Sequence, residues 1–217
     1  MSSTIYEQLR YAIDNDQLIV ELDIKGARLS EARLGGLKAD MLDATGADLS
    51  GATLTRSYLT DCDFPAANLR GADFSQATLW QCKFRNVAAA GARFTGVQAQ
   101  NNVWSEGDYS GADFSAAQLG DSRFQAATLR DTCFANSQGE QVVFDAADLR
   151  DASLIGVFFP AARFRGANLT GADMSGGDFS GADFSGARLD GVRWTGARLD
   201  GATFDDGIAP PELGHNP

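Results

Sequence analysis

Residues 166–190 read GANLTGADMSGGDFSGADFSGARLD, and this stretch decides the fold because it repeats one five-residue unit. Cut into GANLT, GADMS, GGDFS, GADFS and GARLD, it places one large apolar residue at every fifth position. A period of five matches neither the 3.6 residues of an α-helix nor the two residues of a β-strand. The stretch therefore predicts a repeat architecture, and the function must be inferred from the surface that the repeat leaves outside.

The same register runs through most of the chain. Counting in fives from Ile24 reaches Phe204 without an insertion or a deletion. A small residue, most often Ala, precedes most of these centres by two positions, and Asp, Asn or Arg often stands between them. A period held over so many units is very specific to a repeat protein.

This pattern resembles the pentapeptide-repeat family, whose motif is A(D/N)LXX, over roughly residues 22–206. The resemblance implies an all-β fold, a right-handed quadrilateral β-helix with four pentapeptides in each square coil. It also implies that the centre and the small residue face inward, whereas the other three positions face water. About nine coils of twenty residues follow from that geometry.

The centres support this geometry independently, because reading them at intervals of twenty separates them by type. Face 1, which starts at Ile24, consists mostly of Phe, and face 2, which starts at Leu29, consists mostly of Leu. Face 3 starts at Leu34 and has four Phe in its middle, whereas face 4, the series through Ala39, is mixed. Opposed Phe faces crossed by Leu-rich faces predict a packed square interior.

Both ends of a solenoid need covers. Four apolar residues at helical spacing, Ile5, Leu9, Ala12 and Ile13, predict a short helix that covers the first coil. After the last centre the chain reads DDGIAPPELGHNP, which offers no helix able to form a dimer, so a monomer is expected. We divide the chain into an N-terminal cap with a short helix, the β-helix and a C-terminal tail, over residues 1–21, 22–206 and 207–217.

The composition bounds the class of partner. The chain has 217 residues and a formal net charge of −11, which repels anionic partners such as bare nucleic acid or a membrane surface. A protein partner with a basic surface is favoured instead. No charged start precedes an apolar run, and no run of eighteen apolar residues occurs, so we expect a cytoplasmic protein.

The sequence predicts no catalytic residue, no metal site and no cofactor. The one histidine, His215, lies three residues from the end, so a Ser or Cys nucleophile would lack its usual base. Cys62 and Cys82 occupy the inward small slot one coil apart, where we interpret them as interior filler, with a metal or redox role as the alternative. Cys133 occupies an outward slot.

Face 4 departs most from the repeat on its outward side. Exposed aromatic residues surround a Gln-rich middle that lacks the Asp found elsewhere, a composition typical of protein interfaces. The alternative is a Gln ladder that stacks for stability beside incidental aromatic residues. Small centres at Ala99 and Gly139 predict a local dent on the same face. The predicted partner-binding residues are Tyr58, Trp80, Gln98, Gln100, Gln118, Gln138, Glu140 and Phe158.

Other departures are scattered. In VQAQNNVWSEGDY, residues 97–109, Asn102 and Gly107 replace the inward Ala, which indicates a simple irregularity rather than a site. The sequence also predicts exposed apolar side chains on other faces, at Val103, Val143 and Ile155.

Three functions remain after this reading. The first is a non-catalytic protein that neutralises a DNA-acting enzyme. Within this class we favour an immunity protein that binds a secreted nuclease toxin. The resemblance also admits a DNA-mimic protector of a type II topoisomerase, but relatives of that kind typically carry a C-terminal dimer helix and coil-breaking loops that this chain lacks. The second is a structural scaffold. The third, an enzyme, would need a pocket and a base that the sequence does not supply.

Overall fold

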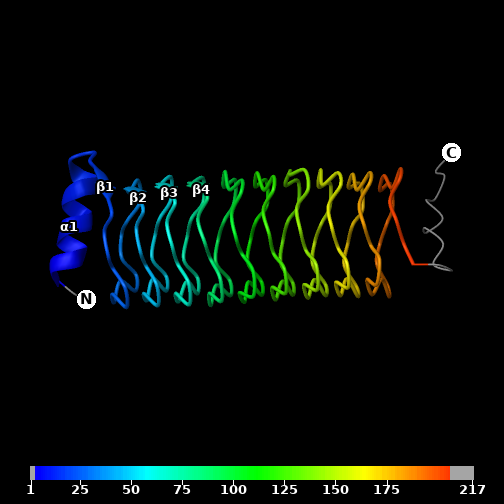
Figure 1. The fold of residues 1–217 in the computed structure, drawn as a ribbon, viewed down its shortest axis with the longest axis horizontal. Helices are drawn as coiled ribbons and strands as arrows, with labels where there is room; N and C mark the ends of the chain where they lie inside the picture. The colour runs from blue at the N-terminus through cyan, green and yellow to red at the C-terminus, as the bar shows by residue number, and fades with distance from the viewer. Residues whose placement is uncertain (1–2, 206–217) are drawn as a thin grey trace.

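The chain winds into a rod of stacked coils behind an N-terminal helix (Figure 1). The structure is a computed structural model and describes residues 3–205. Residues twenty positions apart pair in parallel along the whole rod, from Asp23 with Asp43 to Asp183 with Thr203. The right-handed quadrilateral β-helix predicted from the repeat is therefore confirmed.

Face 4 carries the regular strands. They are β1 (Leu18–Val20), β2 (Lys38–Asp40), β3 (Tyr58–Thr60) and β4 (Thr78–Trp80), which form one parallel sheet in the order β1-β2-β3-β4. Their register continues the twenty-residue period, because Ile19 pairs with Ala39. The ladder therefore already begins at Leu18, within the segment that we assigned to the cap.

The helix α1 (Ser3–Asp14) covers the first coil. Leu9 and Ala12 are buried, and Leu9 joins the hydrophobic core of the rod. Arg10 Nη1 donates a hydrogen bond to the carbonyl oxygen of Arg33, 3.0 Å away, which ties the helix to the coil below. The tail at 207–217, which includes His215, lies outside the described residues.

Aromatic rings fill the interior in two ways. Along one face they stack, as between Phe64 and Phe84, whose ring centroids are 4.7 Å apart and whose planes differ by 5°. Across the square they meet edge to face, as between Phe64 and Phe74 at 6.3 Å and 88°. Both arrangements suit the ring quadrupole, so the opposed Phe faces support each other.

One irregular stretch of the sequence has a structural cause. Tyr109 takes a Leu position on face 2, is fully buried, and donates from its hydroxyl to the carbonyl oxygen of Phe84 at 2.9 Å. A Cβ at residue 107 would lie 2.6 Å from the Tyr109 ring, so Gly107 is the residue that admits the larger side chain. Burial also raises the pKa of Tyr109 well above its usual value.

The corner from face 4 to face 1 differs from the other corners in the first coils. Elsewhere a backbone bond closes the turn, as from Ala27 N–H to Ile24 C=O. Within residues 3–205, Leu79 C=O and Cys82 N–H make no such bond to each other. The Asn102 side chain from the next coil bonds to both, because Oδ1 accepts from Cys82 N–H at 2.7 Å and Nδ2 donates to Leu79 C=O at 3.0 Å.

The buried cysteines make the corresponding contact in the two preceding coils. Cys82 Sγ donates to Leu59 C=O at 3.5 Å, and Cys62 Sγ donates to Ala39 C=O at 3.7 Å. These thiols therefore hydrogen bond to an open corner and do more than fill space. The neighbouring Cys62 thiol, together with burial, raises the pKa of Cys82 well above its usual value.

The Phe124→Ala variant tests the core. Its fully buried ring stacks between Trp104 and Phe144, so truncation leaves a cavity and should lower the free energy of unfolding by about 3–5 kcal/mol. Chemical denaturation measures this loss. Trp80→Ala, on the surface, serves as the control, and an equal loss in both variants would contradict the assignment of inward and outward positions.

The Asn102→Ala variant tests the corner bridge. It leaves Cys82 N–H and Leu79 C=O without partners in the interior, so stability should fall by about 1–3 kcal/mol for each orphaned group. Gln100→Ala, two residues away and half-buried, is the matched control for thermal unfolding. If both variants melt together with the wild type, the bridge does not stabilise the corner.

Candidate functional site

Face 4 gathers the exposed apolar side chains of the molecule. Eight large hydrophobic residues are exposed among the described residues, and five of them belong to the outward rows of face 4. Met41, a sixth, occupies the corner that follows this face. Tyr11 on the helix and Ile155 on face 3 are the other two. The five on face 4 are Leu18, Val20, Tyr58, Trp80 and Phe158.

The predicted binding residues lie on this face as one surface. Tyr58 and Trp80 come from the neighbouring strands β3 and β4 and have exposed fractions of 49% and 42%. Gln98, Gln118 and Gln138 follow in register, and Phe158 comes next in this row with an exposed fraction of 44%. Trp80 and Phe158 are four coils apart, which is about 19 Å along the rod.

A hollow of about 290 Å³ lies beside Phe158, where the sequence predicted a dent. Gly139 has no Cβ, and a Cβ there would lie 2.8 Å from the backbone of Leu119 and Gly120. The coil at Gly139 can therefore pack closely against the preceding coil, and the absence of a side chain leaves a hollow at the surface. The hollow is lined by Gln100, Gln118, Gly120, Gln138, Gly139, Glu140 and Phe158.

The sequence reading missed the part of this surface near the helix. Leu18, Val20 and Met41 are exposed, with Leu18 and Val20 in the same outward rows as Tyr58 and Trp80. Leu18 and Val20 precede Ile24, the first centre of the repeat, so the count from Ile24 does not include them. Counting back twenty residues from Lys38 and Asp40 would have found them.

Two apolar residues differ from their expected exposure. Val103 and Val143 are only half-buried and do not stand free on the surface, because larger side chains rise in the coils beside them. Ile155 is exposed, as predicted.

Several aspartates of the rod accept hydrogen bonds from the residue two positions later. Asp48 Oδ1 accepts from the backbone N–H and the hydroxyl of Ser50, at 3.2 and 2.7 Å, and Asp183 does the same with Ser185 at 2.9 and 2.5 Å. These hydrogen bonds favour the charged carboxylate and lower the pKa of both aspartates. Arg150 and Arg130 lower the pKa of Asp148 in the same sense.

The Asp–Ser contacts predict how stability depends on pH. Because the folded pKa lies below the unfolded value of about 3.9, the stabilisation is full above that value and is lost as pH falls through the folded pKa. The melting temperature should therefore hold steady from pH 7 to about pH 5 and fall below about pH 4.

The Ser50→Ala/Ser185→Ala variant is the control for that titration. It removes the hydroxyl bonds, brings the two pKa values closer to their unfolded values, and should melt lower at pH 7 while losing less on acidification. An acid profile identical to that of the wild type would show that these contacts do not set it.

The described residues offer little for metal chemistry. No group of three or more His, Cys, Asp or Glu within residues 3–205 could hold a metal ion. None of the helices in that range is long and apolar enough to cross a membrane. Cys62, Cys82 and Cys133 are all free thiols.

Family profiles match nearly the whole rod. A pentapeptide repeat region matches residues 57–134, pentapeptide repeats in eight copies match 27–64 and 143–181, and repeats in nine copies match 169–208. The chain therefore belongs to the pentapeptide-repeat family. No curated protein sequence gives a significant match.

A solved structure of another pentapeptide repeat protein shows the same architecture. HetL, a pentapeptide repeat protein involved in heterocyst differentiation regulation in the cyanobacterium Nostoc sp. strain PCC 7120, is similar with a TM-score of 0.77 and 25% identity. That match covers 89% of this chain and 90% of HetL. QnrB1, a plasmid-mediated fluoroquinolone resistance protein, matches at 21% identity over 87% of this chain and 89% of its own, but its TM-score of 0.39 is too low to support a comparison of shape.

Proposed function

We propose that this chain is a non-catalytic protein-binding rod that neutralises a DNA-acting enzyme by docking it on face 4. The observation that carries the proposal is that, within residues 3–205, six of the eight exposed large hydrophobic residues lie on face 4 and its edge. Apolar side chains scattered singly need no explanation, whereas a row of them on one of four faces indicates an interface.

The surface has the composition of a binding site. Tyr58, Trp80 and Phe158 provide aromatic anchors of the kind that dominate binding energy, and the Gln side chains between them provide neutral hydrogen-bonding groups. Between Tyr58 and Pro160 the outward rows of face 4 hold one carboxylate, Glu140. Few charges thus have to be desolvated when a partner covers the middle of this face.

The charge of the whole molecule favours a basic partner. A net charge of −11 attracts the basic surface that an enzyme uses to bind DNA, which accelerates encounter while the aromatic anchors slow release. We propose a nuclease toxin as that enzyme, an immunity role for this chain, a monomeric rod and a cytoplasmic location. HetL, whose rod is similar, is involved in regulation, and a regulatory role is compatible with neutralisation of an enzyme.

The test is capture of the partner with matched baits. Wild type, Trp80→Ala/Phe158→Ala and Ile155→Ala are used to capture proteins from a lysate of the source cells, with the product of each neighbouring gene included. Ile155 is the control because its exposed fraction, 44%, equals that of Phe158 but it lies on face 3.

We expect a nuclease to bind wild type and Ile155→Ala, to lose about 2 kcal/mol of binding energy for each substituted anchor, and to cleave DNA more slowly when bound. All three baits should melt alike. Capture of topoisomerase subunits would replace the toxin with a protected topoisomerase, and equal capture by all three baits would contradict the role of face 4. Capture of nothing specific would favour a scaffold.

A further inference from the structure

The outer side of face 1 reverses its charge partway along the rod. In the first three coils its outward residues and preceding corner are mainly acidic, as at Asp23, Asp43 and Asp63. Over the next five coils they hold five cations and two carboxylates, on a chain whose net charge is −11. The cations are Lys83, Arg85, Arg123, Arg163 and Arg165, and the carboxylates are Asp121 and Asp145.

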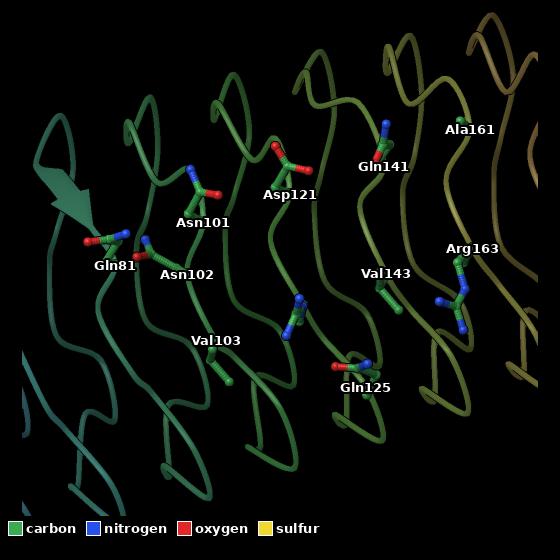
Figure 2. A pocket seen from close by; sticks show the side chains of 11 residues that line it. Gln81, Asn101, Asn102, Val103, Asp121, Gln125, Gln141, Val143, Ala161 and Arg163 are labelled. Carbon is green, nitrogen blue, oxygen red and sulfur yellow. The ribbon is translucent and has the colours of Figure 1, made fainter. Parts of the chain in front are cut away.

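A groove of about 810 Å³ lies over these coils, along the corner between face 4 and face 1 (Figure 2). Its corner side is lined mainly by amide side chains, including Gln81, Asn101 and Gln141. Its face 1 side is a row in which valine and arginine alternate, paired coil by coil through parallel bridges. That row is Val103, Arg123, Val143 and Arg163.

The alternation gives the groove a regular relief. Val103 and Val143 are half-buried and form low points, whereas Arg123 and Arg163 are exposed and stand above them. Because neighbouring coils are about 4.8 Å apart and Arg123 and Arg163 are two coils apart, their side chains leave the backbone about 9.6 Å apart.

The two arginines differ in their contacts with other residues, and both keep N–H donors that can bind an anion. Arg163 is held by an ion pair with Asp145, which orients its guanidinium and leaves further N–H donors free. The Arg123 side chain has no hydrogen bond or ion pair with any residue in the range 3–205. Arg123 is thus an unpaired cation at the centre of the groove.

We propose that this groove binds an extended acidic polypeptide segment whose carboxylates are spaced three residues apart. A polyproline II helix has three residues per turn and a rise of about 3.1 Å per residue, so every third side chain projects from the same side about 9.3 Å along. That repeat matches the spacing of Arg123 and Arg163, each of which can hold a carboxylate in bidentate fashion.

The amide wall suits the backbone of such a segment. A polyproline II chain has no internal hydrogen bonds, so its carbonyl and N–H groups remain available. Gln81, Asn101 and Gln141 carry both donors and acceptors and line the opposite side of the groove. The valines accept the apolar parts of the residues between the carboxylates.

A polypeptide fits better than a single-stranded nucleic acid. A nucleic acid carries one charge on every nucleotide, and the net charge of −11 together with Asp121 inside the groove opposes so dense an anion. A carboxylate at every third residue brings less charge and places it at the two arginines. This inference concerns a different surface from face 4 and does not depend on the proposed function.

Fluorescence anisotropy with a labelled (Glu-Pro-Pro)4 peptide tests the groove at low ionic strength. We expect saturable binding to the wild-type protein and about tenfold or greater weakening in Arg123→Gln/Arg163→Gln. The matched control is Arg28→Gln/Arg93→Gln, which removes two exposed cations from faces 2 and 3 and should bind as the wild type does. Trp80→Ala/Phe158→Ala should also bind the peptide normally, which separates this result from the face 4 test.

A second peptide and an oligonucleotide complete the experiment. The peptide (Glu-Glu-Pro-Pro-Pro-Pro)2 has the same composition but places its carboxylates in adjacent pairs, so it should bind more weakly. Equal binding of both peptides, equal loss in both double variants, or no peptide binding to the wild type would overturn the proposal. Binding of labelled oligothymidine in place of (Glu-Pro-Pro)4 would also overturn it.

Discussion

The hydrogen-bond ladder between neighbouring coils is the constraint on which the rest of the structure depends. On each face, one residue of every coil pairs with the residue twenty positions later, and no insertion interrupts this register from Asp23 to Thr203. Side chains of equivalent residues must therefore stack about 4.8 Å apart, both inside the rod and on its surface. The stacked rings of Phe64 and Phe84 and the surface row of Gln98 and Gln118 are two results of this one rule.

Because the ladder fixes spacing, a departure in one letter acts on its neighbouring coils. Asn102 replaces a small residue, and its side chain satisfies the backbone groups of Leu79 and Cys82 in the coil before. Gly139 lacks a Cβ, and a hollow lies above it beside Phe158. Irregular residues in this rod thus bridge an open corner, admit a larger side chain to the core, as Gly107 does for Tyr109, or shape a surface.

The rod presents two contrasting surfaces that share a corner. Face 4 carries exposed apolar side chains around a Gln-rich, nearly uncharged middle, whereas the adjoining stretch of face 1 carries exposed arginines above half-buried valines. The remaining acidic residues are largely held by Ser hydroxyls, backbone N–H groups and arginines, as at Asp48 and Asp148. A rigid scaffold of this kind offers binding partners fixed spacings rather than an enclosed pocket.

The sequence by itself determined the repeat, the inward and outward positions, the aromatic faces and the face on which exposed aromatics gather. It could do so because each pentapeptide has the same pattern of inward and outward positions, and a fixed period then places every residue on a face. Tertiary structure alone decided how residues twenty positions apart contact one another. The bridge from Asn102 to Leu79 and Cys82, the depth of Val103 beside Arg123, and the extension of face 4 to Leu18 depend on packing between coils, which no single pentapeptide contains.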